Sequence, residues 1–141
     1  MTKIREVFTP MIDEAARAFL QKTLIARLSV VDGDGCPHTV PVWFMLDGDD
    51  VVFISARDTR KVGYIGANPK GAVIIGGDSG DEAGYLIKGT LAIEEDPDGV
   101  WLKKLTFRYE EPALAAQHVA EWAPLDIVVI RLRPNKVIKV A

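Results

Sequence analysis

Two adjacent cations, Arg60 and Lys61, stand at the start of a short predicted helix within the segment SARDTRKVGYIGANPKGAVII. A helix N-terminus already carries a partial positive charge, so each cation in the first turn opposes the helix dipole by about 0.3–1 kcal/mol. A phosphate would accept bonds from the first backbone N–H groups, from the Thr59 hydroxyl and from both cations. The alternative is that both side chains extend into water, and these residues alone do not decide between the two interpretations.

The composition of the chain limits what such a site can hold. The chain has 141 residues, of which 48% are hydrophobic and 26% charged, so we predict one globular domain over residues 1–141. Its formal net charge of −3 argues against general nucleic-acid binding, which needs a cationic surface to displace counterions. Any anion site must therefore be local.

The sequence shows no signal for export or for membrane insertion. The first ten residues, MTKIREVFTP, are polar, and no run of about 18 apolar residues follows. The one cysteine, Cys36, excludes an intramolecular disulfide, and His38 and His118 lack the spacing of metal ligands. We therefore expect a cytoplasmic protein without membrane contact or a metal site.

The first half of the chain predicts a helix followed by three strands. Residues 10–21 fit an amphipathic helix with Met11, Ala15, Ala18 and Phe19 on one side. Residues 24–31, 38–46 and 51–56 read as strands separated by the Asp-Gly clusters DGDG and DGDD, which are typical of tight hairpins. The simplest arrangement is an antiparallel meander.

The second of these strands has two apolar faces. Alternation places His38, Val40, Val42, Phe44 and Leu46 on one face and Thr39, Pro41, Trp43 and Met45 on the other. We expect both faces to be covered.

The second half of the chain continues with short elements. A helix over 59–67 ends before Pro69, because proline disfavours helical geometry in the residue preceding it. A strand over 71–76 and an acidic loop lead to a strand over 85–95, with a bulge or close approach at Gly89. Two helices, over 96–109 and 112–122, precede a final strand or hairpin over 126–140. The fold class is mainly β with short helices: a six- to seven-stranded antiparallel barrel.

The ordered set VPVWF, an Asp-Gly turn, VVFIS, TRK, NP and IKGT resembles the pyridoxamine 5'-phosphate oxidase-like family of FMN-binding split barrels. The likeness extends from about Leu24 to Val137. It implies a split barrel that binds FMN at the interface of a homodimer.

The resemblance also implies which residues bind the cofactor. In the vitamin B6 oxidase, the Arg and Lys of a Ser-Arg-Lys motif bind the FMN phosphate, and these roles fall on Arg60 and Lys61, with Thr59 in place of the Ser. Ser55 takes the place of a flavin-contacting Thr, and Ile54 the place of a Tyr. The preceding strand, which would line the flavin ring, supplies Thr39, Val40, Pro41, Val42, Trp43 and Phe44.

The chain departs from the oxidase at several positions. Thr39 and Phe44 replace an Arg and a Lys of the oxidase strand, and Gly84 stands where a Gln reaches the flavin. The C-terminal VIKVA lacks the Trp and Arg of oxidases. The resemblance therefore implies the cofactor phosphate site and not the oxidase's substrate site, so the small-molecule substrate and the catalytic residues are unknown.

Three alternatives stay open at the level of sequence. Relatives of this fold bind a deazaflavin coenzyme in the same groove, and others bind flavin without turnover, for electron transfer, storage or sensing. A weaker alternative is haem, with His38 or His118 as axial ligand. Trp101, Phe107 and Trp122 on the later helices predict core or dimer packing, where they could cover the ring of the partner's cofactor.

Overall fold

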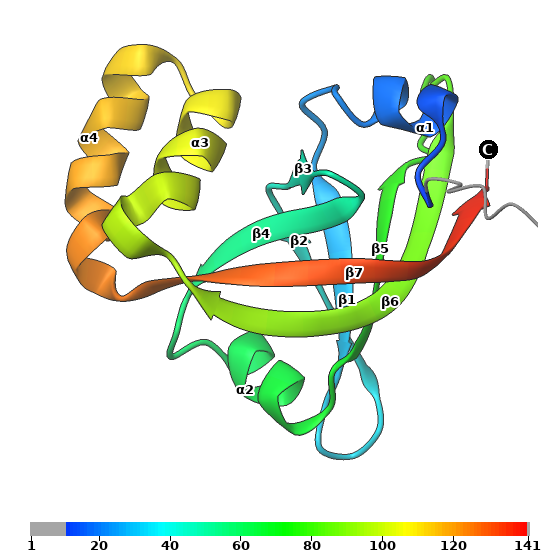
Figure 1. Cartoon of the computed structure of the whole chain (residues 1–141), viewed down its shortest axis with the longest axis horizontal. Helices are drawn as coiled ribbons and strands as arrows, with labels where there is room; N and C mark the ends of the chain where they lie inside the picture. Colours follow the sequence, from blue (N-terminus) through cyan, green and yellow to red (C-terminus); the bar gives the residue numbers. More distant parts are fainter. Residues whose placement is uncertain (1–10, 141) are drawn as a thin grey trace, which may run out of the picture.

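Seven antiparallel strands curl into one sheet that wraps around an apolar core (Figure 1). The structure is a computed structural model and describes residues 11–140. The order of the strands in the sheet is β2-β1-β5-β6-β7-β4-β3. The strands are β1 (Ala26–Val31), β2 (Pro37–Val42), β3 (Met45–Asp47), β4 (Asp50–Ala56), β5 (Lys70–Gly76), β6 (Gly84–Glu95) and β7 (Ile127–Lys139). This is the predicted mainly β, antiparallel split barrel.

Four α-helices lie outside the sheet. In Figure 1, α1 covers one end of the barrel, α2 lies at the opposite end, and the hairpin of α3 and α4 stands at one side. The helices are α1 (Glu14–Phe19), α2 (Arg60–Ala67), α3 (Val100–Tyr109) and α4 (Pro112–Trp122), with 3-10 turns η1 (Pro97–Gly99) and η2 (Ala123–Leu125). No helix within residues 11–140 is long and apolar enough to cross a membrane.

The predicted strand over 38–46 is in fact two strands at opposite edges of the sheet. β2 pairs with β1, whereas β3 pairs with β4, and Trp43 and Phe44 connect the two edges. The backbone N–H of Phe44 donates to the hydroxyl of Tyr109 and not to a neighbouring strand. The predicted meander is therefore wrong, because this link carries the chain across the opening between the edges.

The two faces of β2 are also unlike the prediction. Thr39 and Pro41 are exposed, whereas His38, Val40 and Val42 are half-buried. Alternation along an edge strand that pairs with a single neighbour leaves one face toward the core and the other toward solvent. The expectation that both faces are covered fails within this chain.

The opening helix is shorter and turned relative to the prediction. Asp13 caps α1 by accepting a bond from the N–H of Ala16 at 2.8 Å, so the helix starts there, and Pro10 lies outside the described residues. Met11 is 42% exposed, and Ala15 and Ala18 are also exposed. Of the predicted face only Phe19 is buried; the core side consists of Ile12, Ala16, Phe19 and Leu20.

The later elements match their predictions closely. α2 begins after Thr59 and ends before Asn68, next to Pro69. The register of β6 against β7 shifts between Lys88 and Gly89, and a Cβ on Gly89 would overlap the carbonyl oxygen of Arg133. The last segment is a single long strand, β7, which pairs with β6 and also with β4.

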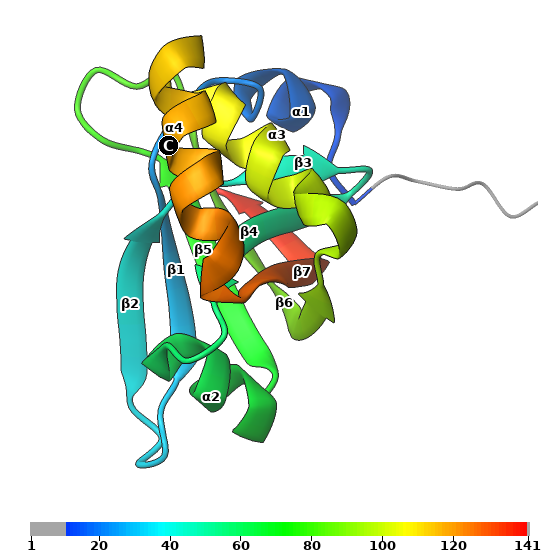
Figure 2. The same ribbon diagram turned by 90° about the vertical axis from the view of Figure 1, so that its left-hand side faces the viewer.

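The α3–α4 hairpin packs on the sheet through a small second core. Val52 of β4, Leu105 of α3 and Val129 of β7 form its buried centre. Figure 2 shows α3 lying between α4 and the sheet. This packing brings the C-terminal end of α3 to the Trp43–Phe44 link, where the candidate site lies.

Candidate cofactor-binding site

A shallow groove lies where β2 ends, beside β4 and the start of α2. Its volume is about 280 Å³, and it is lined by Pro41, Val42, Trp43, Ile54 and Lys61. All five were singled out from the sequence, and they come from three separate segments of the fold: residues 41–43, β4 and α2. The structure thus brings the predicted ring-lining segment and one of the two predicted phosphate-binding cations to the same place.

The start of α2 leaves its first-turn N–H groups without a side-chain cap. Thr59 is the N-cap residue, but its hydroxyl makes no capping bond and instead lies 3.1 Å from the Ala56 carbonyl and 2.9 Å from the Ser55 hydroxyl. Ser55 is buried and also donates to the Ala56 carbonyl, at 3.0 Å. The two predicted hydroxyl groups therefore hold the turn before the helix, while the N–H groups of the first turn stay available to an anion.

The two predicted cations are placed differently. Arg60 is exposed, whereas Lys61 is half-buried and reaches the groove. Burial lowers the pKa of Lys61, because removal of water disfavours the charged ammonium. Within residues 11–140 neither Arg60 nor Lys61 forms an ion pair. A half-buried ammonium without a carboxylate partner is suited to an anionic ligand.

A third cation nearby is already neutralised. Arg57 lies 2.8 Å from a carboxylate oxygen of Asp126 and 2.6 Å from one of Glu95. Its backbone N–H also donates to the Asp126 carbonyl at 3.0 Å. Arg57 therefore anchors the turn before α2 to the start of β7, and its charge is balanced there.

Other predicted residues lie outside the groove. The side chain of Phe44 is 0% exposed and belongs to the barrel core, so its ring does not line the groove. Thr39 is exposed and its hydroxyl lies 2.8 Å from that of Ser29. Val40 pairs with Leu28 and is half-buried. The Phe44 side chain therefore lies in the core and not in the groove, and the ring-binding roles of Phe44, Thr39 and Val40 stay predictions.

Sequence reasoning missed the residue that supports the groove wall, Tyr109. Tyr109, at the end of α3, stacks on Trp43 with ring centroids 5.0 Å apart and planes 6° apart. Trp122 of α4 lies 6.1 Å from Trp43. Trp43, Tyr109 and Trp101 all pack on the second core, whereas Phe107 is 47% exposed. The sequence shows Tyr109 only as an aromatic residue at the end of a predicted helix, and the fold is needed to show that it faces Trp43.

The two histidines have partners other than a metal or haem. The Nδ1 atom of His118 lies 2.6 Å and 2.8 Å from the two carboxylate oxygens of Glu110, and its ring stacks on Trp122 at 4.4 Å. The ring of His38 packs edge-on against Tyr64 at 5.3 Å. These contacts give both rings structural roles.

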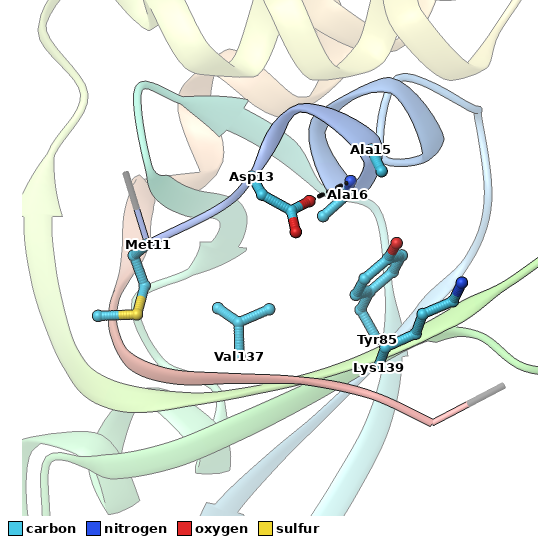
Figure 3. Close-up of a pocket in the computed structure, with 7 residues that line it drawn as sticks. All are labelled: Met11, Asp13, Ala15, Ala16, Tyr85, Val137 and Lys139. Carbon is cyan, nitrogen blue, oxygen red and sulfur yellow. Dashed lines mark hydrogen bonds between the residues drawn. The ribbon is translucent and has the colours of Figure 1, made fainter. Parts of the chain in front are cut away.

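Larger cavities occur elsewhere but contain none of the predicted site residues. One of about 320 Å³ lies between α1 and the barrel, where Asp13 and Ala16 of the α1 end and Tyr85, Val137 and Lys139 of the sheet line it (Figure 3). The carboxylate of Asp13 is engaged there in the cap of α1. Another, of about 370 Å³, is lined by the ion-paired Arg57 and Asp126. Neither offers a half-buried cation beside an apolar and aromatic wall.

Solved structures with the same fold fall into several functional groups. An F420 reductase is 28% identical, with a TM-score of 0.72 over 90% of this chain and 98% of that one. A candidate pyridoxamine 5'-phosphate oxidase from Listeria innocua is 26% identical, with a TM-score of 0.65 over 87% of this chain and 93% of that one. A heme binding protein from Mycobacterium smegmatis, 21% identical with a TM-score of 0.64, shares the fold over 96% of this chain and 55% of its own.

The sequence itself gives a family match that covers nearly the whole chain. No protein of curated function matches it. The sequence profile of pyridoxamine 5'-phosphate oxidase matches residues 12–141, which include every strand, every helix and the groove. The chain therefore belongs to the pyridoxamine 5'-phosphate oxidase family.

Proposed function

We propose that the chain binds FMN in the groove beside α2 and acts as a flavin-dependent oxidoreductase on a small molecule. The observation that carries this proposal is Lys61, a half-buried ammonium without an ion pair among the described residues, which lines a groove with an apolar and aromatic wall. Bound FMN would supply hydride or electron transfer. The protein's part is to bind and orient the cofactor and to exclude water from it.

Each part of the groove suits one part of FMN. Lys61, Arg60 and the first-turn N–H groups of α2 would neutralise and bind the phosphate. Thr59 and Ser55, behind that turn, would keep it rigid and face the ribityl chain. Pro41, Val42, Trp43 and Ile54 would contact the ring. Pro41 has no N–H, so any hydrogen bond to the ring on this side comes from neighbouring backbone groups.

The size of the groove favours a homodimer. Small-molecule sites are usually about 300–1,000 Å³ and enclose most of the ligand. A groove of about 280 Å³ in one chain would leave part of the cofactor uncovered. The outer face of β5 and β6 carries the half-buried side chains of Ile74 and Leu86, which are paired in register. We propose that a second copy packs on this face and completes the site.

A deazaflavin coenzyme is the second candidate. The F420 reductase with 28% identity covers 90% of this chain, which favours a cofactor of that class. The groove does not distinguish the two by charge alone, since both cofactors carry phosphate. A flavin carrier without turnover is a third possibility, and it would bind FMN but oxidise no nicotinamide or B6 substrate. The cytoplasmic location expected from the sequence stays a prediction.

Titration of the purified protein with FMN and with the deazaflavin coenzyme, followed by fluorescence, tests the proposal. We expect binding of FMN in the micromolar range or tighter, with one site per chain. The Lys61→Met variant should bind FMN at least about tenfold more weakly. Lys70→Met, which removes an exposed lysine of β5, should bind as the wild type does. Tighter binding of the deazaflavin coenzyme would favour the second candidate, and binding of neither cofactor would refute both.

A further inference from the structure

The aromatic wall of the groove is held in place by residues that lie outside the groove. Trp43 belongs to the link between β2 and β3, where neither neighbouring strand fixes its backbone. A large side chain on such a link can adopt several rotamers unless other groups pack against it. The orientation of this wall therefore depends on what contacts Trp43 from behind.

Tyr109 provides the closest parallel contact. Its ring is nearly parallel to that of Trp43: the angle between the two ring planes is 6°, and the ring centroids are 5.0 Å apart. Such a distance and angle are typical of an offset stack, which contributes about 0.5–1.5 kcal/mol beyond the burial of area. The stack leaves Trp43 one flat face against Tyr109, while its side chain also lines the groove.

The hydroxyl of Tyr109 bonds to the backbone of two segments, one before β1 and one in the Trp43–Phe44 link. It donates to the Leu24 carbonyl at 2.6 Å, just before β1, and accepts from the N–H of Phe44 at 3.1 Å, directly after Trp43. Burial raises the pKa of Tyr109, and hydrogen bonding to Phe44 and Arg108 opposes the shift in part. The hydroxyl therefore stays protonated at neutral pH and can donate to Leu24.

A second support lies on α4. Trp122 approaches Trp43 at 6.1 Å with a tilt of 49°, and the imidazole of His118 stacks on Trp122 at 4.4 Å. Glu110 holds that imidazole through Nδ1. The ends of α3 and α4 thus form one aromatic support, with Tyr109 as the member that touches both the ring of Trp43 and the backbone after it.

We infer that Tyr109 is a positioning residue of the groove, which orients Trp43 as a flat wall for a planar heteroaromatic ring. The inference rests on the proposed function, because the flavin ring is the planar group that the groove would receive. It assigns the two ends of the groove to different ligand groups. The ring end depends on Tyr109 acting through Trp43, and the phosphate end depends on Lys61.

Three probes separate these ends: riboflavin, which lacks the phosphate, FMN, and inorganic phosphate. Tyr109→Phe keeps the stack but loses both hydrogen bonds. We expect it to weaken the binding of riboflavin and of FMN alike, by about fivefold. Tyr109→Leu loses the stack as well and should weaken both by about tenfold or more. Neither variant should change the dissociation constant of inorganic phosphate. Lys61→Met should show the reverse pattern, with riboflavin binding unchanged.

A double-mutant cycle distinguishes positioning from general loss of structure. If Tyr109 acts through Trp43, Tyr109→Leu should have no further effect on riboflavin binding in a Trp43→Leu background. Trp101→Leu is the matched control, because Trp101 lies on the same helix and packs on the same second core as Tyr109, whereas the stack on Trp43 belongs to Tyr109. It should leave riboflavin binding unchanged. A Tyr109→Leu variant that weakens phosphate equally, or that weakens riboflavin further in the Trp43→Leu background, would overturn the inference.

The apo protein gives a readout that is independent of cofactor. Stacked aromatic rings contribute near-ultraviolet circular dichroism, so Tyr109→Leu should remove the same band as Trp43→Leu. Persistence of that band would show that Tyr109 does not orient Trp43. A wild type that binds neither riboflavin nor FMN would refute the proposed function and the ligand assigned here, while these bands still decide whether Tyr109 holds Trp43.

Discussion

Lys61 lies in an environment that favours ligand binding at the expense of the stability of the free protein. Its ammonium is half-buried, and burial lowers its pKa from the usual 10.5. The unfolded chain therefore binds its proton more tightly than the folded chain does, and the charged lysine destabilises the fold at neutral pH. An anion in the groove would reverse this effect.

Removal of that charge should stabilise the apo protein while it weakens FMN binding. We expect Lys61→Met to raise the Tm by about 2 °C at pH 7, a small value because the side chain is partly solvated. Differential scanning calorimetry of both proteins without ligand measures this. Lys70→Met should leave the Tm unchanged, and a fall in the Tm of Lys61→Met would show that Lys61 stabilises the fold.

The same lysine predicts how binding and stability depend on pH. As the pH rises toward 10.5, the folded chain loses the Lys61 proton first, so the Tm difference between the wild type and Lys61→Met should shrink. FMN affinity should fall over the same range, because the neutral amine no longer pairs with the phosphate. The FMN affinity of Lys61→Met should lack this part of the fall. An equal fall of FMN affinity in the wild type and in Lys61→Met would show that another group titrates.

At the level of elements, the bulge of β6 is a position where only glycine fits. A Cβ on Gly89 would overlap the backbone of Arg133 on β7, so Gly89→Ala should destabilise the protein by about 2–4 kcal/mol. Gly66→Ala is the matched control, since no atom lies within 4 Å of its Cβ position in α2. It should stabilise the helix by about 0.5–1 kcal/mol. Urea denaturation of both variants measures the difference, and equal effects would contradict the assigned bulge.

The elements that local signals specify were predictable from the sequence. Proline at 69 ends α2, Gly89 marks the bulge, and the apolar spacing of α3 and α4 gives both helices. The break between β2 and β3 was not predictable, because the apolar alternation continues through Phe44 without interruption. At the break, the Phe44 N–H donates to the hydroxyl of Tyr109, 65 residues further along the chain, which no local pattern indicates.

In the candidate site too, residues with local sequence signals were predictable, and residues placed by distant contacts were not. Pattern and resemblance placed Pro41, Trp43 and Lys61 at one site, and the fold brings them to one groove. Tyr109 was missed, because its role depends on where α3 docks and not on any local spacing. The predicted buried side of the opening helix was also wrong. The helix starts after its cap at Asp13 and has six residues, too few for apolar periodicity to identify one face.

For the whole molecule, the proposed dimer predicts a variant that loses both assembly and binding. Leu86→Asp places a charge on the outer face of β6, and we expect it to convert the dimer to the 15.5 kDa monomer in sedimentation velocity. FMN binding should weaken with it, because each site would lose its second wall.

Leu114→Asp is the control for the dimer. It introduces the same charge at an exposed leucine of α4, away from the β5 and β6 face. It should leave both mass and FMN affinity unchanged. A wild-type protein that sediments as a monomer at micromolar concentration would refute the dimer, and a monomeric Leu86→Asp with full FMN affinity would show that one chain suffices for the site.

The link at Trp43 and Phe44 couples the groove to the opening of the barrel. One segment both crosses between the two edges of the sheet and supplies the wall of the groove. Any fluctuation that separates β2 from β3 must therefore displace that wall, and a ligand in the groove would oppose the fluctuation. The exchange rate of the Phe44 amide with solvent would then report occupancy of the groove.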